Sequence, residues 1–275
     1  MTHNPSASPA YGDLSLVATA VEEVARLAGG IAARAFRSTL HVMRKADGSP
    51  VTDADRAAER AAREWIETRF PHDGILGEEF GAARPEAARQ WIIDPIDGTK
   101  TFVHGVPLYG TLVAVASGER ILAGCIHVPS LDETVVAARG LGCWWNGTRA
   151  AVSTVEAIEA ATVLTTDARF GSDAIQRASW DRLASRAGMA RTWGDCYGYL
   201  LVATGRAEVM LDGRLGTWDA AAVQVAIEEA GGVFTDWRGV ATAFGGSAIA
   251  TNAVLAAEVR SILGARRPAG HDAAH

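Results

Sequence analysis

Cysteine is scarce in this chain of 275 residues, which carries only Cys125, Cys143 and Cys196. The number is odd and no two of them have CxxC spacing, so we expect neither a disulfide framework nor a thiolate zinc site. The seven histidines form no HxH or HExxH pattern, the usual signature of a histidine-based zinc site. A few unpaired cysteines fit a reducing, cytoplasmic setting.

Long apolar runs and an excess of positive charge are also missing. No apolar segment approaches the ~20 residues that cross a bilayer, and residues 1–10 lack the apolar stretch of a secretory signal. The 32 acidic residues outnumber the 26 basic ones, for a net charge of -6, which argues against a nucleic-acid-binding surface. We therefore expect neither a membrane nor a nucleic acid as a partner.

What the chain does have is enough hydrophobic sequence, 48%, for a sizeable core. Its periodicity first predicts two helices. The helix over 13–37 has inward residues at three- and four-residue steps: Leu16, Ala20, Val24, Leu27 and Ile31. A polar loop over 45–50 follows. The helix capped by Thr52 or Asp53 runs to about Phe70 and has these inward residues: Ala57, Ala61, Trp65 and Ile66.

Strand patterns dominate the middle of the chain. Short strands are expected at 75–76 and at 91–93, the second stopped by Asp94-Pro95. A hairpin-rich sheet follows, with strands over 112–116, 121–128 and 134–138, and then a loop region over 139–160.

Beyond residue 160 strands and helices alternate, which predicts an α/β fold. The strands are 162–165, 207–211, 233–235 and 248–250, and the helices are 172–187, 196–203, 218–230 and 252–263. We expect an N-terminal α+β half over 11–150, an α/β half over 151–265, and flexible tails at 1–10 and 266–275.

The densest chemical signal is the stretch Trp91-Ile-Ile-Asp-Pro-Ile-Asp-Gly-Thr-Lys100. An apolar strand runs directly into Asp94 and Asp97, and these carboxylates repel each other unless a cation lies between them. Gly98 allows a sharp turn and a close approach of the backbone to a ligand. Hard oxygen ligands of this kind suit Mg²⁺, although an ordinary polar turn would have a similar pattern.

Three further acids follow weaker patterns. Glu78 ends a short apolar strand, although adjacent acids such as Glu78-Glu79 are often surface residues. Asp55 and Asp219 stand at helix starts, where capping alone explains an acid. Asp55 is the better functional candidate of its pair, since capping needs only one of Asp53 and Asp55.

Taken together, these segments resemble the inositol-monophosphatase superfamily of metal-dependent, lithium-sensitive phosphatases. The resemblance covers roughly residues 13–263 and rests on four stretches in this order: Val51–Asp55, Gly77–Glu79, Trp91–Lys100, and Trp218-Asp219 with Glu229–Gly232. It implies a layered α-β-α-β-α sandwich, as in inositol monophosphatases and fructose bisphosphatases, and a homodimer. One departure is Phe80, where a serine often follows Gly-Glu-Glu.

The resemblance also implies a site with two or three Mg²⁺ ions, most of whose ligands come from the N-terminal half. The ligands it implies are Glu78, Asp94, the Ile96 carbonyl, Asp97 and Asp219. It makes Asp55 and Thr99 the pair that orients the attacking water, and Glu78 is counted with them as catalytic. The backbone N–H groups of Gly98 and Thr99 would cradle the phosphate.

Substrate choice is suggested by a closer similarity to the histidinol-phosphatase branch. It rests on Lys100, Phe102, Gly105–Pro107, Thr235–Trp237 and the stretch Gly194-Asp-Cys-Tyr-Gly-Tyr-Leu-Leu-Val-Ala-Thr-Gly205. The implied substrate contacts are Asp97, Gly98, Thr99, Gly194, Asp195, Cys196, Asp212 and Asp219. Two acids outside the metal set, Asp195 and Asp212, would favour an alcohol that carries positive charge. A helix cap explains Asp195 equally well, and an ordinary loop acid explains Asp212.

The sequence thus predicts Mg²⁺-dependent hydrolysis of a small phosphate monoester, with L-histidinol phosphate as the first candidate. The alternatives are a related phosphatase acting on inositol 1-phosphate, a sugar phosphate or a nucleotide 3′-phosphate, and a catalytically silent metal- or ligand-binding protein.

Overall fold

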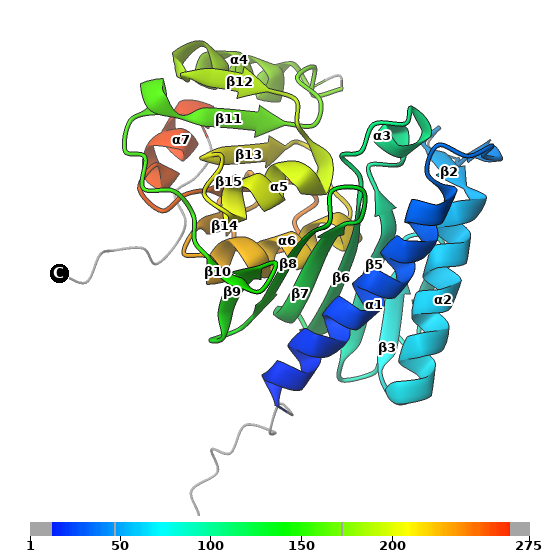
Figure 1. Ribbon diagram of the computed structural model, residues 1–275. Helices are drawn as coiled ribbons and strands as arrows, with labels where there is room; N and C mark the ends of the chain where they lie inside the picture. The colour runs from blue at the N-terminus through cyan, green and yellow to red at the C-terminus, as the bar shows by residue number, and fades with distance from the viewer. Residues whose placement is uncertain (1–12, 47, 172, 265–275) are drawn as a thin grey trace, which may run out of the picture.

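A computed structural model describes residues 13–46, 48–171 and 173–264. The tails that the sequence predicts to be flexible, 1–10 and 266–275, lie outside the described residues. Among the described residues, two sheets, a short hairpin and several helices form the molecule shown in Figure 1.

The larger sheet has eight strands in the order β10-β9-β8-β7-β6-β5-β3-β4. All neighbouring strands are antiparallel except β3 and β5. Its strands are β3 (Gly74–Gly77), β4 (Gly81–Ala83), β5 (Gln90–Asp97), β6 (Gly110–Ser117), β7 (Arg120–Val128), β8 (Glu133–Ala138), β9 (Gly142–Trp145) and β10 (Thr148–Ala150).

The smaller sheet has five strands in the order β12-β11-β13-β15-β14, of which β11 is parallel to both of its neighbours. Its strands are β11 (Thr162–Thr165), β12 (Met189–Arg191), β13 (Val209–Asp212), β14 (Val233–Thr235) and β15 (Ala248–Thr251). A separate hairpin joins β1 (Val42–Arg44) to β2 (Pro50–Thr52).

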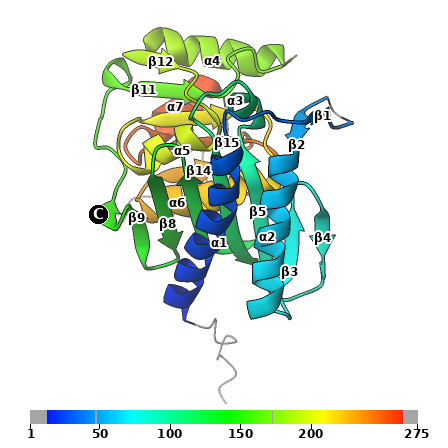
Figure 2. The ribbon, with the colours of Figure 1, turned by 45° about the vertical axis from the view of Figure 1, so that its right-hand side comes forward.

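Helices lie on both outer faces and between the two sheets, which confirms the α-β-α-β-α order. In Figure 2, α1 and α2 run side by side over one face of the larger sheet, while α5 and α6 pack between the sheets and α4 and α7 cover the smaller sheet. The helices are α1 (Leu14–Ala35), α2 (Asp53–Arg69), α3 (Thr99–Val103), α4 (Ala174–Arg186), α5 (Asp195–Ala203), α6 (Thr217–Glu229) and α7 (Ala256–Leu263), with a 3₁₀ turn over Ile158–Ala160.

The buried faces of the first two helices differ from those expected. Leu16 is 68% exposed and Leu27 is 40% exposed, because α1 turns a stripe of smaller residues toward the sheet. Its buried residues are Val17, Ala20, Val21, Val24, Ala25, Ala28, Gly29 and Ala32. In α2 the buried stripe passes through Ala58 and Ala62 instead of Ala57 and Ala61. Alanines on several sides of a helix leave its orientation open to tertiary packing.

Two predictions about the strands were also wrong. The expected loop over 139–160 contains the hairpin β9–β10, whose glycines mark turns with positive φ at Gly142 and Gly147. Strand β5 does not stop at Asp94 but continues to Asp97, with a register shift against β6 between these two residues. Pro95 lies within that irregularity, where a residue without an N–H group is tolerated.

Several short or shifted elements were not foreseen. The elements β1, β4, β12 and α3 are only 3, 3, 3 and 5 residues long, too short for periodicity to reveal. Helix α7 begins at Ala256 and not at Asn252; the Asn252 side chain instead accepts a hydrogen bond from the Leu255 N–H before the helix.

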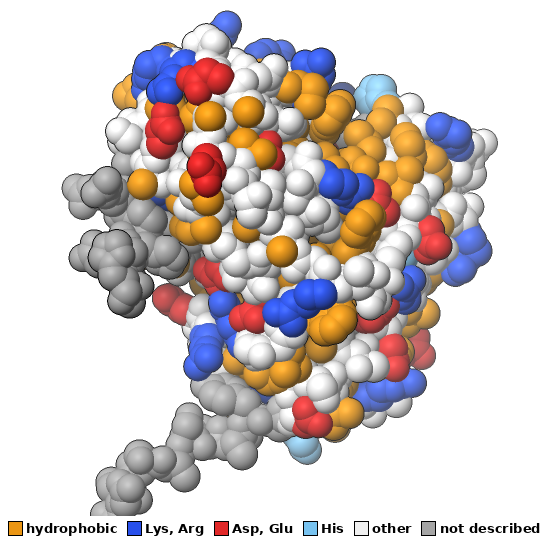
Figure 3. All heavy atoms as spheres, turned by 60° about the vertical axis from the view of Figure 1, so that its left-hand side comes forward, with side chains coloured by type: hydrophobic (Ala, Val, Ile, Leu, Met, Phe, Trp, Pro, Cys, Tyr) orange, Lys and Arg blue, Asp and Glu red, His pale blue; other side chains and the backbone are white. Residues whose placement is uncertain are grey.

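Charged side chains of both signs lie interspersed with apolar and neutral groups on the face shown in Figure 3. In the part of the chain that the structure describes, no helix has both the length and the apolar character needed to cross a membrane.

Helix α6 approaches the larger sheet closely because Gly124 of β7 has no side chain. A Cβ atom at this position would lie 2.8 Å from Ala222 Cα and 2.8 Å from Val225 Cγ1. The first of these is a backbone atom of α6, so the helix would have to move. Asp219 lies in the first turn of α6. Its position therefore depends partly on the glycine of β7 that lets the helix approach.

We expect Gly124→Ala to destabilise the fold by about 1–3 kcal/mol, as overpacking does, measured by urea unfolding. Gly30→Ala is the matched control, since its Cβ would meet only the Arg34 side chain at 3.7 Å within helix α1. Removing a helical glycine there should stabilise the protein by about 0.5–1 kcal/mol. Equal stability of the Gly124→Ala variant and the natural protein would contradict the close-approach argument.

Candidate functional site

Three carboxylates from two distant parts of the chain meet at the end of β5. Asp94 and Asp97 flank the register shift of that strand, and Asp219 comes from the first turn of α6. Each offers an oxygen atom, and these atoms all lie within 4.8 Å of one another. Asp94 is only 2% exposed. Such a group of hard oxygen donors could hold a divalent cation.

Backbone N–H groups hold each of these three side chains in place by hydrogen bonds. The Ile96 N–H donates to Asp94 Oδ1 at 3.0 Å, and the Cys196 N–H, at the start of α5, donates to Asp97 Oδ2 at 2.5 Å. Asp219 Oδ2 accepts from the Gly216 N–H at 2.7 Å. Asp219 is therefore a helix-capping residue and a member of the cluster at the same time.

Burial raises the pKa of Asp94 well above its ordinary value, and the charges of Glu78, Asp97 and Asp219 raise it further. Burial is also the main cause of the raised pKa of Asp97, followed by the charges of Asp195 and Asp219. These shifts mean that the group carries its full negative charge only at a cost, which a bound cation would offset.

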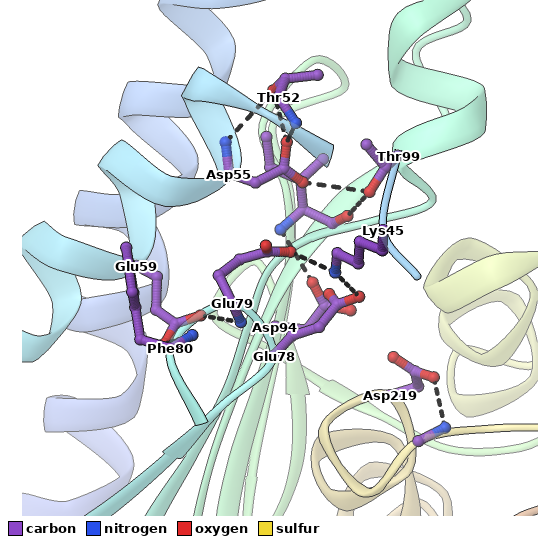
Figure 4. Close-up of polar contacts among 12 residues, drawn as sticks. Lys45, Thr52, Asp55, Glu59, Glu78, Glu79, Phe80, Asp94, Thr99 and Asp219 are labelled. Atoms are coloured by element: carbon purple, nitrogen blue, oxygen red, sulfur yellow. Dashed lines mark hydrogen bonds and ion pairs between the residues drawn. The ribbon is translucent and has the colours of Figure 1, made fainter. Parts of the chain in front are cut away.

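Glu78 stands beside this cluster and pairs with a basic residue (Figure 4). Lys45 Nζ lies 2.7 Å from Glu78 Oε1 and 2.6 Å from Glu79 Oε1. Burial lowers the pKa of Lys45, but its contacts with the two glutamates outweigh that effect and raise it overall. Glu78 therefore already faces a positive charge, although its oxygens are not among those of the three-aspartate group.

Asp55 and Thr99 contact each other, as the resemblance implies. Asp55 is fully buried; its Oδ1 accepts from Thr99 Oγ1 at 3.2 Å and its Oδ2 accepts from the Thr52 N–H at 2.8 Å (Figure 4). The Ile96 carbonyl lies 3.0 Å from the same hydroxyl, whose single proton is shared between these two acceptors. Burial raises the pKa of Asp55 to about 6, against the lowering effect of the Thr52 hydrogen bonds. Asp55, and not the exposed Asp53, completes the capping box of α2.

A cleft of about 1060 Å³ opens above these groups. Most of the residues expected in the site line it: Glu78, Asp94, Ile96, Asp97, Gly98, Thr99, Gly194, Asp195 and Asp219. Asp55 lies behind Thr99. Cys196 is buried, with its backbone N–H directed at Asp97 and its thiol packed near Gly110.

Asp195 packs against the turn that follows β5. It has a positive φ of 51°, and its Oδ2 accepts from Thr101 Oγ1 at 3.1 Å. A Cβ on Gly98 would lie 2.9 Å from the same oxygen, and Gly98 itself has a φ of 81°. Glycine at this turn therefore leaves room for Asp195, which comes from the far half of the chain.

A small recess of about 100 Å³ adjoins the cluster. It is lined by four acids and one basic residue, Asp97, Asp195, Asp212, Asp219 and Arg214, together with Thr166, Tyr199 and Leu215. Asp212 is 6% exposed; it accepts hydrogen bonds from the Tyr199 hydroxyl at 2.9 Å and from the Thr166 N–H at 3.0 Å. The Thr166 hydroxyl in turn accepts from the Asp195 N–H at 2.8 Å. One short network thus joins the two acids that the sequence assigned to substrate.

Sequence reasoning missed Lys45 and Glu59, two charged residues of the site. Lys45 was placed in a polar loop, where nothing distinguishes it from a surface lysine. Glu59 is fully buried on α2 and contacts the turn after β3. The sequence offers one sign of this role. Glu59 lies on the same buried side of the helix as Ala58 and Ala62, where a charged group needs a hydrogen-bonding partner.

Comparisons with known proteins agree on the class. One relative is a histidinol-phosphatase from Chlorobaculum parvum, 45% identical over 218 residues, which cover 79% of this chain and 84% of the relative. A histidinol-phosphatase from Mycobacterium tuberculosis is 38% identical over 231 residues, with coverages of 82% and 89%. The chain is a phosphatase, a hydrolase of phosphoric monoesters.

The family follows from a match over nearly the whole chain. The sequence model of the inositol monophosphatase family matches residues 13–269, and the protein belongs to that family. The fold is similar to that of an inositol monophosphatase from Zymomonas mobilis, with a TM-score of 0.81, 31% identity, and coverage of 92% of this chain and 99% of the other. The resemblance stated from the sequence is thereby confirmed.

The buried carboxyl of Asp212 should make stability depend on pH in the metal-free protein. Burial raises its pKa from 3.8 to about 7, so between about pH 4 and 7 the folded state keeps a proton that the unfolded state has lost. The contribution of Asp212 to the free energy of unfolding is present below about pH 4 and is lost as pH rises toward 7.

We therefore expect Asp212→Asn, which cannot ionise, to flatten the fall in unfolding free energy over this range, measured by urea unfolding with a chelator present. Asp181→Asn, an exposed acid on α4, is the control and should leave the slope unchanged. The same slope in the Asp212→Asn variant and the natural protein would show that this carboxyl does not titrate as described.

Proposed function

We propose that this phosphatase is Mg²⁺-dependent and hydrolyses L-histidinol phosphate to histidinol and inorganic phosphate. The observation that carries the proposal is the group of three carboxylates within 4.8 Å of one another in a wide cleft. The names of the two relatives described above support the choice of substrate. The homodimer and the cytoplasmic setting stay predictions.

The cation site would be formed by Asp94, Asp97 and Asp219, with Glu78 and the Ile96 carbonyl completing it. The residues fit a hard cation, because every donor is oxygen and the acids carry pKa values that burial has raised. Mg²⁺ at such a site acidifies water and neutralises phosphoryl charge. Glu78 would exchange its contact with Lys45 for one with the cation.

The chain's own groups would do the rest of the chemistry. Thr99 Oγ1, hydrogen-bonded to Asp55 Oδ1, would orient the attacking water, and Asp55 with its pKa of about 6 could take up a proton from it. The N–H groups of Gly98 and Thr99 would bind phosphate oxygens that gain charge in the transition state.

The recess, with four acids against the single basic residue Arg214, supports a cationic alcohol. Histidinol carries an ammonium group and an imidazole, and Asp195 and Asp212 lie beside the cluster without belonging to it. A hydrogen bond between a carboxylate and an ammonium group is worth about 1.5–3 kcal/mol. A neutral polyol would gain only ordinary hydrogen bonds there. Tyr199 is buried under Asp212, and Tyr197 donates to Glu133, so neither supports stacking on an imidazole ring.

Removal of the cation site should abolish the reaction. We expect Asp94→Asn to lose at least about 2 kcal/mol of transition-state stabilisation, about a 30-fold drop in kcat/KM, and activity of the natural protein to vanish with chelator and return with Mg²⁺. Asp53→Asn, an exposed acid at the start of α2, should retain full activity. Normal turnover by the Asp94→Asn variant, or by the chelated protein, would contradict the metal assignment.

The substrate assignment is tested by phosphate release from histidinol phosphate and from inositol 1-phosphate. We expect kcat/KM to favour histidinol phosphate, and Asp195→Asn to lower that value about tenfold or more while changing the value for inositol 1-phosphate less than about twofold. Asp181→Asn serves as the remote control. Equal turnover of both substrates would instead support a broader phosphatase of this family.

A further inference from the structure

Glu59 is a fully buried carboxylate on the side of α2 that faces the turn between β3 and β4. Its Oε2 accepts the Glu79 N–H at 2.7 Å, and its Oε1 accepts the Phe80 N–H at 3.3 Å (Figure 4). A buried acid that accepts two backbone N–H groups stabilises the conformation of that backbone, because leaving those donors unpaired would cost free energy.

The fit between Glu59 and this turn is close. A Cβ on Gly77 would lie only 1.9 Å from Glu59 Oε1, so a residue with a side chain at that position would displace the Glu59 carboxylate. Arg63, one turn further along α2, donates from Nε to Glu59 Oε1 at 2.8 Å and from Nη2 to the Gly81 carbonyl at 2.5 Å. The acid and its arginine thus hold residues 79–81, directly after Glu78, by hydrogen bonds and pack closely against Gly77.

This segment carries Glu78, the acid that faces the cleft. On one side the Glu78 N–H donates to the Ile93 carbonyl of β5 at 3.1 Å, and on the other side the next peptide group donates to Glu59. The same helix also supplies Asp55, four residues before Glu59 and on the same face. Helix α2 therefore sets the positions of two parts of the site at once.

We propose that Glu59 is a positioning residue. It holds the turn that carries Glu78 so that the Glu78 side chain stays beside the three aspartates, and in this way it sets the affinity of the site for Mg²⁺. This inference rests on the proposed function, since it takes Glu78 as a cation ligand. A glutamate offers two anionic oxygens to the two N–H groups. The nearly isosteric glutamine offers one neutral oxygen and would direct its NH₂ group at the second donor.

The test compares the affinity of the substrate-free protein for Mg²⁺ in the Glu59→Gln variant and in the natural chain, measured by calorimetry. Loss of a group that orients a metal ligand weakens binding by about 10–100-fold, and we expect about tenfold or more here. The Mg²⁺ concentration for half-maximal phosphate release should rise in parallel, while the substrate KM at saturating Mg²⁺ stays unchanged. Glu59→Asp keeps the charge on a shorter side chain and should give a smaller loss.

Glu229→Gln is the matched control. Glu229, at the end of α6, also accepts two backbone N–H groups of a turn, those of Gly140 and Gly142, at 3.0–3.1 Å. The Glu229→Gln variant should be less stable but should bind Mg²⁺ like the natural protein. This result separates a general loss of stability from a displacement of Glu78.

The outcomes are distinguishable. If the natural protein binds no Mg²⁺, the proposed function fails and this inference fails with it. If the natural protein binds Mg²⁺ and folded Glu59→Gln binds it equally well, only the positioning role is overturned. Should Glu59→Gln not fold, Glu59→Asp decides, since natural affinity in that variant would overturn the proposal as well.

Discussion

Repulsion between enclosed carboxylates is the constraint on which the rest of this structure depends. Asp94, Asp97 and Asp219 offer oxygens within 4.8 Å of one another, and burial makes each charge more costly than it would be in water. The acids stay together only because rigid elements hold them: the end of β5, the first turn of α6 and the first turn of α5. The close packing of α6 on Gly124 belongs to the same arrangement.

The fold reduces that cost by using helix starts. Asp55, Asp195 and Asp219 all lie in the first turn of a helix, where the helix dipole and free N–H groups favour negative charge. Asp55 caps α2 and contacts Thr99; Asp219 caps α6 and joins the aspartate group. For Asp55 and Asp219, capping and a place in the site are therefore not alternatives, as the sequence alone had suggested, but two consequences of one position.

Strong local patterns were sufficient for much of the fold and for the centre of the site. The stretch around Asp94 and Asp97 was recognisable because an apolar strand, a proline and a glycine are adjacent in the chain. The larger helices and most strands were found for the same reason. The orientation of α1 was not, because alanines and valines lie on several of its sides and the sheet selects among them. The hairpin over 142–150 was missed because its turn glycines resemble those of a loop.

The sequence by itself determined the local features: which segments form the longer helices, where acids stand at their starts, and which carboxylates follow the apolar residues of β5. Only the tertiary structure decided that Lys45 lies against Glu78, that Glu59 holds the turn beside it, and that Asp212 is enclosed next to Asp195. The physical reason is distance along the chain. A capping residue interacts with its own neighbours, whereas a buried acid acquires its partners, and its pKa, from whichever elements pack against it.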